Sequence, residues 1–107
     1  MIDVYEIRFK DSDNCTIRIC QEDEKGNEVE QLNVCLKYKD SWSAAISEHI
    51  TSFFKKHPIV KTFEETKDTM RMMTVYSFIT EDGSRLKVDA IDKVKEMSEI
   101  IAAKKHS

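Results

Sequence analysis

The sequence predicts a single α+β domain with a mostly antiparallel sheet of about five strands and two helices, in the order βββα-ββ(β)α. Three observations carry this prediction. Three segments before residue 40 alternate apolar and polar side chains, one amphipathic helical stretch follows them, and a second strand-rich region precedes a final helical pattern. The chain has 107 residues, so residues 1–107 are expected to form one domain with its own core.

The first three strands are predicted from alternation with a period of two residues. Residues 2–10 place Tyr5, Ile7 and Phe9 on one side of a strand, with Glu6 and Arg8 on the other. After a turn-forming cluster at 11–14, residues 15–20 continue the alternation, and residues 32–38 repeat it after a polar loop that contains Gly26-Asn27. Neighbouring strands of this kind favour an antiparallel meander.

An amphipathic helix follows the third strand. Asp40 and Ser41 supply the side chains that cap a helix N-terminus. Apolar and histidine positions then recur at steps of three and four residues, at Trp42, Ala45, Ile46, His49, Ile50 and Phe53. The helix is expected to end near Lys56, because Pro58 cannot continue it and disfavours helical geometry at His57.

The second half predicts a hairpin, a short strand and a final helix. Residues 59–66 and 70–80 read as two strands joined around Lys67-Asp68. The strand at 70–80 has apolar side chains on both parities, so we expect it to be buried on both faces and to lie at the sheet centre. Residues 85–88 predict a short extra strand, and Asp89 is expected to cap a helix that turns Ala90, Val94, Met97 and Ile101 inward.

Composition excludes several classes of protein. With 40% hydrophobic and 35% charged residues and a formal charge of −3, the chain is too apolar for disorder and too weakly charged to predict a nucleic-acid binder. No apolar run approaches the roughly 18 residues that suggest a membrane span, and residues 1–10 lack the pattern of a signal peptide. The odd set Cys15, Cys20 and Cys35 is a poor disulfide framework. We therefore expect a small acidic cytoplasmic protein with reduced thiols.

No motif in the sequence names a reaction. It contains no G-x-S-x-G elbow, phosphate loop or dinucleotide fingerprint. The cysteines and histidines lack the spacing of a zinc site, and the acidic pairs at 64–65 and 81–82 lack the further ligands of a calcium loop. His49 is interpreted as a histidine at the edge of the core. We expect no catalytic residues, no cofactor and no bound metal, and hence no enzyme.

The leading hypothesis is a non-enzymatic protein-interaction module, such as an adaptor, an inhibitor or a chaperone-like protein. Binding energy at such surfaces is concentrated in a few apolar or aromatic anchors, and methionine is over-used where a surface must adapt to a partner. Phe54 departs by one position from the apolar stripe of its helix, which suggests exposure. The candidate partner-binding residues are Trp42, Phe54, Met70, Met72 and Met73. The partner would be another protein, or a second copy of the chain in a homodimer, and no membrane is involved.

Two other classes stay open. The densest basic patch consists of Lys55, Lys56, His57 and Lys61, joined by Arg71. It suits a groove for phosphates and defines a nucleic-acid-binding alternative that would use Lys55, Lys56, Lys61 and Arg71. Cations at a helix C-terminus are also favoured by the backbone dipole, however, and no aromatic stacking motif accompanies them. A small enzyme or enzyme subunit is the remaining alternative.

Overall fold

The computed structural model describes residues 1–9, 14–37 and 39–91, and within these ranges it leaves out the side chains of 39–43 and 91. The described part holds six strands and one helix in the order βββαβββ. In chain order these are β1 (Ile2–Phe9), β2 (Cys15–Glu22), β3 (Glu28–Leu36), α1 (Lys39–Lys56), β4 (Val60–Asp68), β5 (Met73–Thr80) and β6 (Arg85–Ile91).

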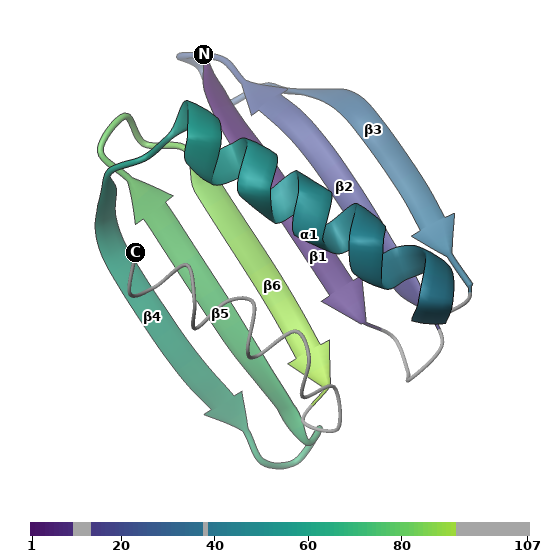
Figure 1. Cartoon of the computed structure of the whole chain (residues 1–107). Coiled ribbons are helices and arrows are strands. Elements are labelled where there is room, and N and C mark those ends of the chain that lie inside the picture. Colours follow the sequence, from purple (N-terminus) through teal and green to yellow (C-terminus); the bar gives the residue numbers. More distant parts are fainter. Residues whose placement is uncertain (10–13, 38, 92–107) are drawn as a thin grey trace.

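The six strands form one sheet in the order β3-β2-β1-β6-β5-β4 (Figure 1). Antiparallel pairing joins β1, β2 and β3 into the predicted meander, and it joins β4, β5 and β6 into a second one. The two meanders meet where β1 runs parallel to β6, with Ile7 beside Val88. The sheet is therefore mixed, and the prediction of a mostly antiparallel sheet of five strands is right only in outline.

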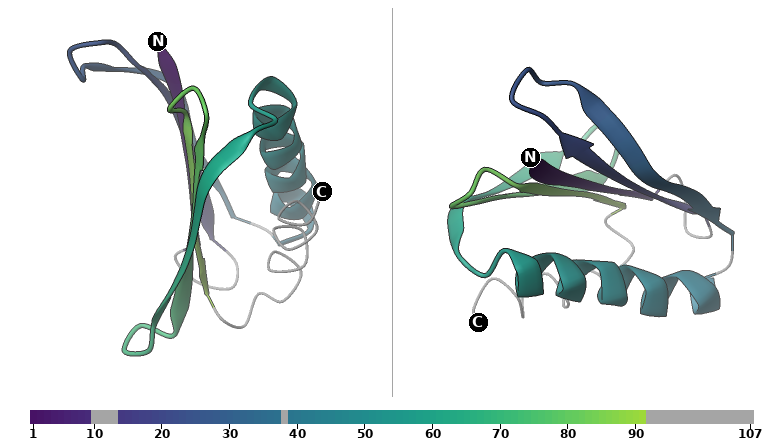
Figure 2. Two further views of the ribbon diagram at one scale, coloured as in Figure 1. Left: turned by 90° about the vertical axis from the view of Figure 1, so that its left-hand side faces the viewer. Right: turned by 90° about the horizontal axis from the view of Figure 1, so that it is seen from above.

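Helix α1 connects the two edges of this sheet and lies against one of its faces (Figures 1 and 2). Its buried side chains, Ile46, Ile50 and Phe53, recur at the predicted spacing of four and three residues. Backbone pairing continues to His57, whose N–H donates to the carbonyl of Phe53 at 2.9 Å. The chain then leaves the helix at Pro58, as the sequence predicts.

The core lies between α1 and the sheet face that it covers. Alternate strand residues point into it, and the largest fully buried side chains are Phe9, Phe53, Phe78, Ile7, Ile17, Ile46, Ile50, Leu86 and Val88. The start of β1 is covered on both faces, since Val4 and Tyr5 are both buried although they have opposite parity. The central strands β1 and β6 thus supply the centre of the core.

The other face of the sheet carries a layer of ion pairs. Arg18 lies 2.8 Å from Glu28, and Arg85 lies 2.7 Å from Glu22. Arg8 contacts Asp89 at 3.5 Å, in the parallel pair at the sheet centre. Partly exposed pairs of this kind add little stability one by one, but they neutralise the charges of this face.

The second meander differs from the prediction in three respects. The segment Met70–Met72 is not part of a strand, because β4 continues through Asp68 and β5 begins only at Met73. β5 is not the sheet centre but the second strand from the edge. The short strand predicted at 85–88 is present as the longer β6, so Asp89 and Ala90 lie inside a strand and do not begin a helix. The predicted final helix falls mainly on 92–107, outside the described residues.

Candidate functional site

In the described part of the chain, the outer edge of β4 combines backbone groups that pair with no described strand and nearby apolar side chains that are exposed. β4 ends the strand order, so among the described residues no strand pairs with its outer side, which faces the viewer in the left view of Figure 2. Edge strands present backbone N–H and C=O groups that can pair with another chain. Most of its side chains are exposed, and Phe63 is half-buried against the core.

Exposed apolar side chains flank β4 at both ends. In the described ranges, the exposed large apolar residues are Met1, Val29, Ile59, Val60, Met70 and Met72. Ile59 (59% exposed) and Val60 (37%) stand where β4 begins, and Met70 (95%) and Met72 (58%) follow its end. We call the outer edge of β4 together with these four side chains the β4 edge.

The turn after β4 holds its methionines in a fixed but unusual geometry. Met72 has a φ of 52°, a left-handed conformation that costs a residue with a side chain about 1 kcal/mol or more. The Asp68 carboxylate accepts a hydrogen bond from the backbone N–H of Arg71 at 3.2 Å, and the Arg71 side chain lies 3.5 Å from the same carboxylate. The turn therefore presents two apolar side chains to solvent.

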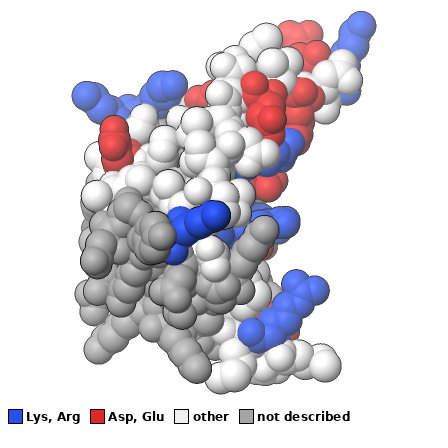
Figure 3. All heavy atoms as spheres, turned by 90° about the vertical axis from the view of Figure 1, so that its right-hand side faces the viewer, with Lys and Arg blue, Asp and Glu red and all other residues white. Residues whose placement is uncertain are grey.

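The opposite edge, β3, is protected by charge. Its only exposed large apolar side chain is Val29, which lies between Glu28 and Glu30, and both of these carboxylates contact Arg18. Figure 3 looks onto this side of the molecule and shows acidic side chains gathered over its upper part. Because β3 carries acidic residues and no basic ones while β4 carries both signs, the two edges are not equivalent as docking surfaces.

The structure separates the predicted partner-binding residues. Met70 and Met72 are exposed at the β4 edge, whereas Met73 begins β5 and is half-buried. Phe54 is half-buried and packs on the core, with its ring centroid 5.2 Å from that of Phe78, so the exposure suggested by its helical position is wrong. Trp42 lies within α1, but its side chain is outside the described part.

The predicted basic patch is divided along β4. Lys55 and Lys56 are exposed in the last turn of α1, and Lys61 lies near the start of β4. Arg71 lies beyond the other end of β4, which at about 3.3 Å per residue places it more than about 20 Å from Lys61. Arg71 also lies beside Asp68. The four side chains do not form one groove.

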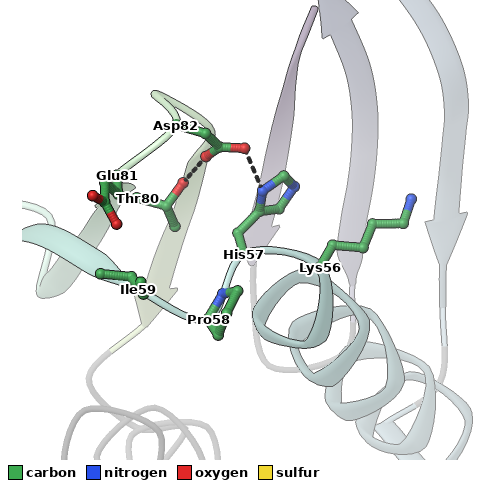
Figure 4. Close-up of a pocket in the computed structure, with 7 residues that line it drawn as sticks. All are labelled: Lys56, His57, Pro58, Ile59, Thr80, Glu81 and Asp82. Atoms are coloured by element: carbon green, nitrogen blue, oxygen red, sulfur yellow. Dashed lines mark hydrogen bonds and ion pairs between the residues drawn. The ribbon is translucent and has the colours of Figure 1, made fainter.

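His57, which the sequence places in the basic patch, lies in a cluster of carboxylates where α1 ends. Nε2 of His57 lies 2.8 Å from Oδ2 of Asp3, and Nδ1 lies 2.7 Å from Oδ2 of Asp82. Both ring nitrogens therefore lie within hydrogen-bond distance of a carboxylate oxygen. The cluster ties the end of α1 to β1 through Asp3, and to the turn between β5 and β6 through Asp82, the contact drawn in Figure 4.

Asp82 is the most strongly perturbed acid of the cluster. Its pKa is lowered to about 2, first by the hydrogen bond from the Thr80 hydroxyl and further by the Ser84 N–H and by His57. Thr80 and Ser84 are buried beneath the turn, and the Ser84 hydroxyl accepts from the backbone N–H of Asp3 at 3.0 Å. Every polar group of the cluster is thus engaged with another, which is the pattern of a structural tie.

A cavity of about 260 Å³ adjoins this cluster. It is lined by Lys56, His57, Pro58, Ile59, Thr80, Glu81 and Asp82. Figure 4 shows His57 and Asp82 facing one another, with Lys56 extending away from them. Ile59 belongs to both the cavity and the β4 edge, so the cavity opens beside the start of β4.

The cysteines form no common site. Cys15 and Cys20 are buried and Cys35 is exposed, and all three are free thiols. Burial raises the pKa of the Cys15 thiol to about 12. In the part of the chain that the structure describes, no three histidine, cysteine or carboxylate side chains are arranged to hold a metal ion.

Comparison with family models, with curated proteins and with solved structures finds no match to this chain. Within the described ranges, no helix has the length and apolar character needed to cross a membrane.

Sequence reasoning found Met70 and Met72 but not the edge that they belong to. The signal for these two residues is their methionine-rich context, whereas the strand pattern does not distinguish Ile59 and Val60 from ordinary strand residues. The His57 cluster was missed altogether, because its three members are far apart in the sequence. The one sequence signal near His57 is Pro58, which predicts that the chain leaves the helix at this point.

Proposed function

We propose that this protein is a non-enzymatic interaction module that binds a partner protein at the β4 edge by pairing with an extended strand of that partner. One observation carries the proposal. Four of the six exposed large apolar side chains in the described ranges flank the same edge strand, and that strand has no described neighbour on its outer side.

Strand addition uses the two kinds of group that the β4 edge offers. Backbone hydrogen bonds along β4 would supply affinity, and side chains at its ends would supply specificity. The flanking side chains gain about 25 cal/mol for each Å² of apolar surface that a partner covers. Met70 and Met72 suit such contacts, because unbranched thioether side chains adapt to the shape of a partner.

The contacts of His57 support a structural role for its imidazole and not a catalytic one. Both ring nitrogens lie against carboxylates, at 2.8 Å from Asp3 and 2.7 Å from Asp82, so the ring edge that a substrate would approach is already occupied by contacts within the protein. The three cysteines offer no alternative, since Cys15 and Cys20 are buried and no base lies beside the exposed Cys35 among the contacts that the structure describes. The nucleic-acid alternative is a weaker proposal, because Arg71 stands apart from the three lysines.

Site-specific photo-crosslinking in the cells that make the protein tests this proposal. A benzophenone side chain at Glu64, exposed on β4, is expected to give one defined protein adduct, whereas the same group at Gln31, exposed on β3, gives none. The double variant Ile59→Lys, Met72→Lys should abolish the adduct, because it puts unpaired charges where apolar contacts form.

The matched control is Val29→Lys, which makes the same change at the other edge. It should leave the Glu64 adduct intact, and all of these exposed positions should tolerate substitution within about 0.5 kcal/mol of stability. An adduct that forms equally from Gln31, or that survives the double variant, would overturn the assignment of the β4 edge.

A further inference from the structure

We infer that Met70 and Met72 form a reversible oxidation site, at which a peroxide converts the two thioethers into sulfoxides and thereby weakens partner binding at the β4 edge. Methionine sulfoxide reductases reverse such oxidation, so the site would act as a switch. This inference rests on the proposed function, because it concerns the regulation of the same edge.

The oxidation step needs only the peroxide and the thioether. A lone pair of the methionine sulfur attacks one oxygen of hydrogen peroxide, so a sulfur–oxygen bond forms while the oxygen–oxygen bond breaks. The sulfur gives up an electron pair, and the leaving hydroxide takes the remaining proton of the transferred oxygen and becomes water. In the reverse step, a dithiol of the reductase is oxidised to a disulfide and the sulfoxide oxygen leaves as water.

The two methionines are open to solvent in the turn that joins β4 to β5 (Figure 1). Met70 is 95% exposed and Met72 is 58% exposed, whereas the next residue, Met73, begins β5 and is half-buried. Peroxide has to reach the sulfur atom itself, so oxidation is expected first at Met70, then at Met72 and last at Met73. Met1 is also exposed, but it precedes β1, and β6 and β5 separate β1 from β4.

Oxidation at these two positions changes the surface and leaves the core as it is. A sulfoxide is polar and disrupts a core in which it is buried. Met70 and Met72 lie outside both strands, since β4 ends at Asp68 and β5 begins at Met73. Their side chains are exposed and are not part of the core. The oxidised protein should therefore stay folded, as a reversible switch requires.

Arg71, which stands between the two methionines in the sequence, offers the new oxygens a partner. Its exposed side chain contacts the Asp68 carboxylate through Nε at 3.5 Å. A guanidinium carries several further N–H donors, whereas a thioether sulfur is only a weak acceptor. A sulfoxide oxygen accepts hydrogen bonds from Arg71 or from water. Either arrangement competes with the apolar contacts that a partner makes at this turn.

The cysteines do not provide such a switch at the β4 edge. Cys15 and Cys20 are buried, and burial raises the pKa of both thiols, which lowers the fraction of the reactive thiolate. Cys35 is exposed, but it belongs to β3, at the opposite edge of the sheet. Its oxidation would change that edge and leave β4 as it is.

The size of the effect follows from the apolar contact that is lost. A partner strand at the β4 edge gains affinity from the methionine surface that it covers, and a sulfoxide removes that gain. About 60 Å² of covered apolar surface corresponds to roughly a tenfold change in affinity. Oxidation of both side chains should therefore weaken binding by about tenfold.

Peroxide treatment of the purified full chain, followed by mass spectrometry of its proteolytic fragments, tests the site itself. Met70 and Met72 should each gain an oxygen atom before Met73 does, and the circular dichroism spectrum should stay that of the untreated protein. Incubation with the two reductases, one for each sulfoxide epimer, and a dithiol should remove both oxygens. Oxidation of Met73 as early as Met70, or unfolding once both turn residues are oxidised, would overturn the inference.

Photo-crosslinking from Glu64 tests the effect on binding. In cells treated briefly with hydrogen peroxide, the adduct should fall by about tenfold relative to untreated cells and return as the reductases act. The matched variant is Met70→Leu, Met72→Leu, which stays apolar and cannot be oxidised. Its adduct is compared only with its own untreated yield, and that ratio should not change. Met73→Leu should remain as sensitive to peroxide as the wild type.

A second variant tests the same point without peroxide. Met70→Gln, Met72→Gln places polar amides where the sulfoxides would stand, so it should give about a tenfold weaker adduct while melting like the wild type. An undiminished adduct from this variant would overturn the inference. So would a leucine variant that loses its adduct to peroxide as the wild type does, because peroxide would then act elsewhere.

The inference and the proposed function fail differently. A Glu64 adduct that persists although Met70 and Met72 are oxidised overturns the switch and keeps the β4 edge as the binding site. Absence of any Glu64 adduct in untreated cells overturns the proposed function and the regulation together. The order of oxidation in the purified protein decides in either case whether the turn is an oxidation site.

Discussion

Nε2 of His57 lies 2.8 Å from Oδ2 of Asp3, a contact between residues 54 positions apart in the sequence. The same ring contacts Asp82 through its other nitrogen, so one side chain joins the end of α1 to the first strand and to the turn between the last two described strands. The cluster lies at the end of the sheet from which β4 begins, where the backbone N–H of Glu81, next to Asp82, donates to the carbonyl of Ile59 at 2.9 Å.

Replacing His57 by alanine should destabilise the fold. Asp3, whose side chain is only 14% exposed, would lose its hydrogen-bond partner, and leaving a buried group without its hydrogen bond costs about 1–3 kcal/mol. Urea unfolding followed by circular dichroism measures the change. Lys56→Ala is the control, since Lys56 is exposed beside it and should alter stability by no more than about 0.5 kcal/mol. Equal stability of His57→Ala and wild type would contradict the role of the cluster.

The lowered pKa of Asp82 predicts that the folded protein loses stability in acid. Its pKa is about 2 in the folded protein against 3.8 for an ordinary aspartate, so its ionised form stabilises the fold above the ordinary pKa. That contribution is lost as the pH falls from about 4 towards 2. The stability difference between wild type and Asp82→Asn should be constant near neutral pH and shrink across this window. A difference that persists unchanged at the acid end would contradict the prediction.

Phe54 is expected to matter for stability and not for an exposed contact. Its ring lies 5.3 Å from Phe53 and 5.2 Å from Phe78 by centroid, in edge-to-face geometry with both. Because it is half-buried, Phe54→Ala should fall at or below the low end of the ~3–5 kcal/mol that truncating a buried phenylalanine costs. Thermal melts measure this, with the exposed Met70→Ala as a control that should melt like wild type.

Met72→Gly should raise the stability of the monomeric fold. A left-handed φ of 52° is strained for methionine and free for glycine, and the exposed side chain gives up little packing. The gain, at most about 1 kcal/mol, is reduced by the greater freedom of glycine in the unfolded chain. Met70→Gly should instead lower stability, because no such strain is relieved there. Equal effects of the two changes on urea unfolding would argue against the turn geometry.

The three cysteines should react in a defined order. Cys35 is exposed, whereas Cys15 and Cys20 are buried and burial raises the pKa of both thiols, that of Cys15 to about 12. Since the thiolate is the reactive form, a thiol-specific reagent should label one thiol rapidly in the folded protein and the other two only on unfolding. Labelling should be confined to Cys35 by mass spectrometry, and Cys35→Ser should remove the fast phase.

Local pattern determined most of the elements of this fold. Alternation predicted β1, β2 and β3, and three- and four-residue spacing together with Pro58 predicted α1 and its end. The same pattern selects Met70, Met72 and Met73 as candidate binding residues. It does not determine whether they are buried or exposed, because a run of apolar residues is compatible with a buried strand and with a strand preceded by an exposed turn.

Tertiary structure decided which strands are neighbours, and with that the site. The parallel pairing of β1 with β6 and the position of β4 at an edge depend on contacts between distant residues, which a period of two does not encode. For the same reason, Phe54 packs on the core although it lies one position off the apolar stripe of its helix. His57 likewise contacts two carboxylates that no sequence spacing links to it. Side-chain periodicity is a property of short segments, whereas exposure at an edge is a property of the assembled sheet.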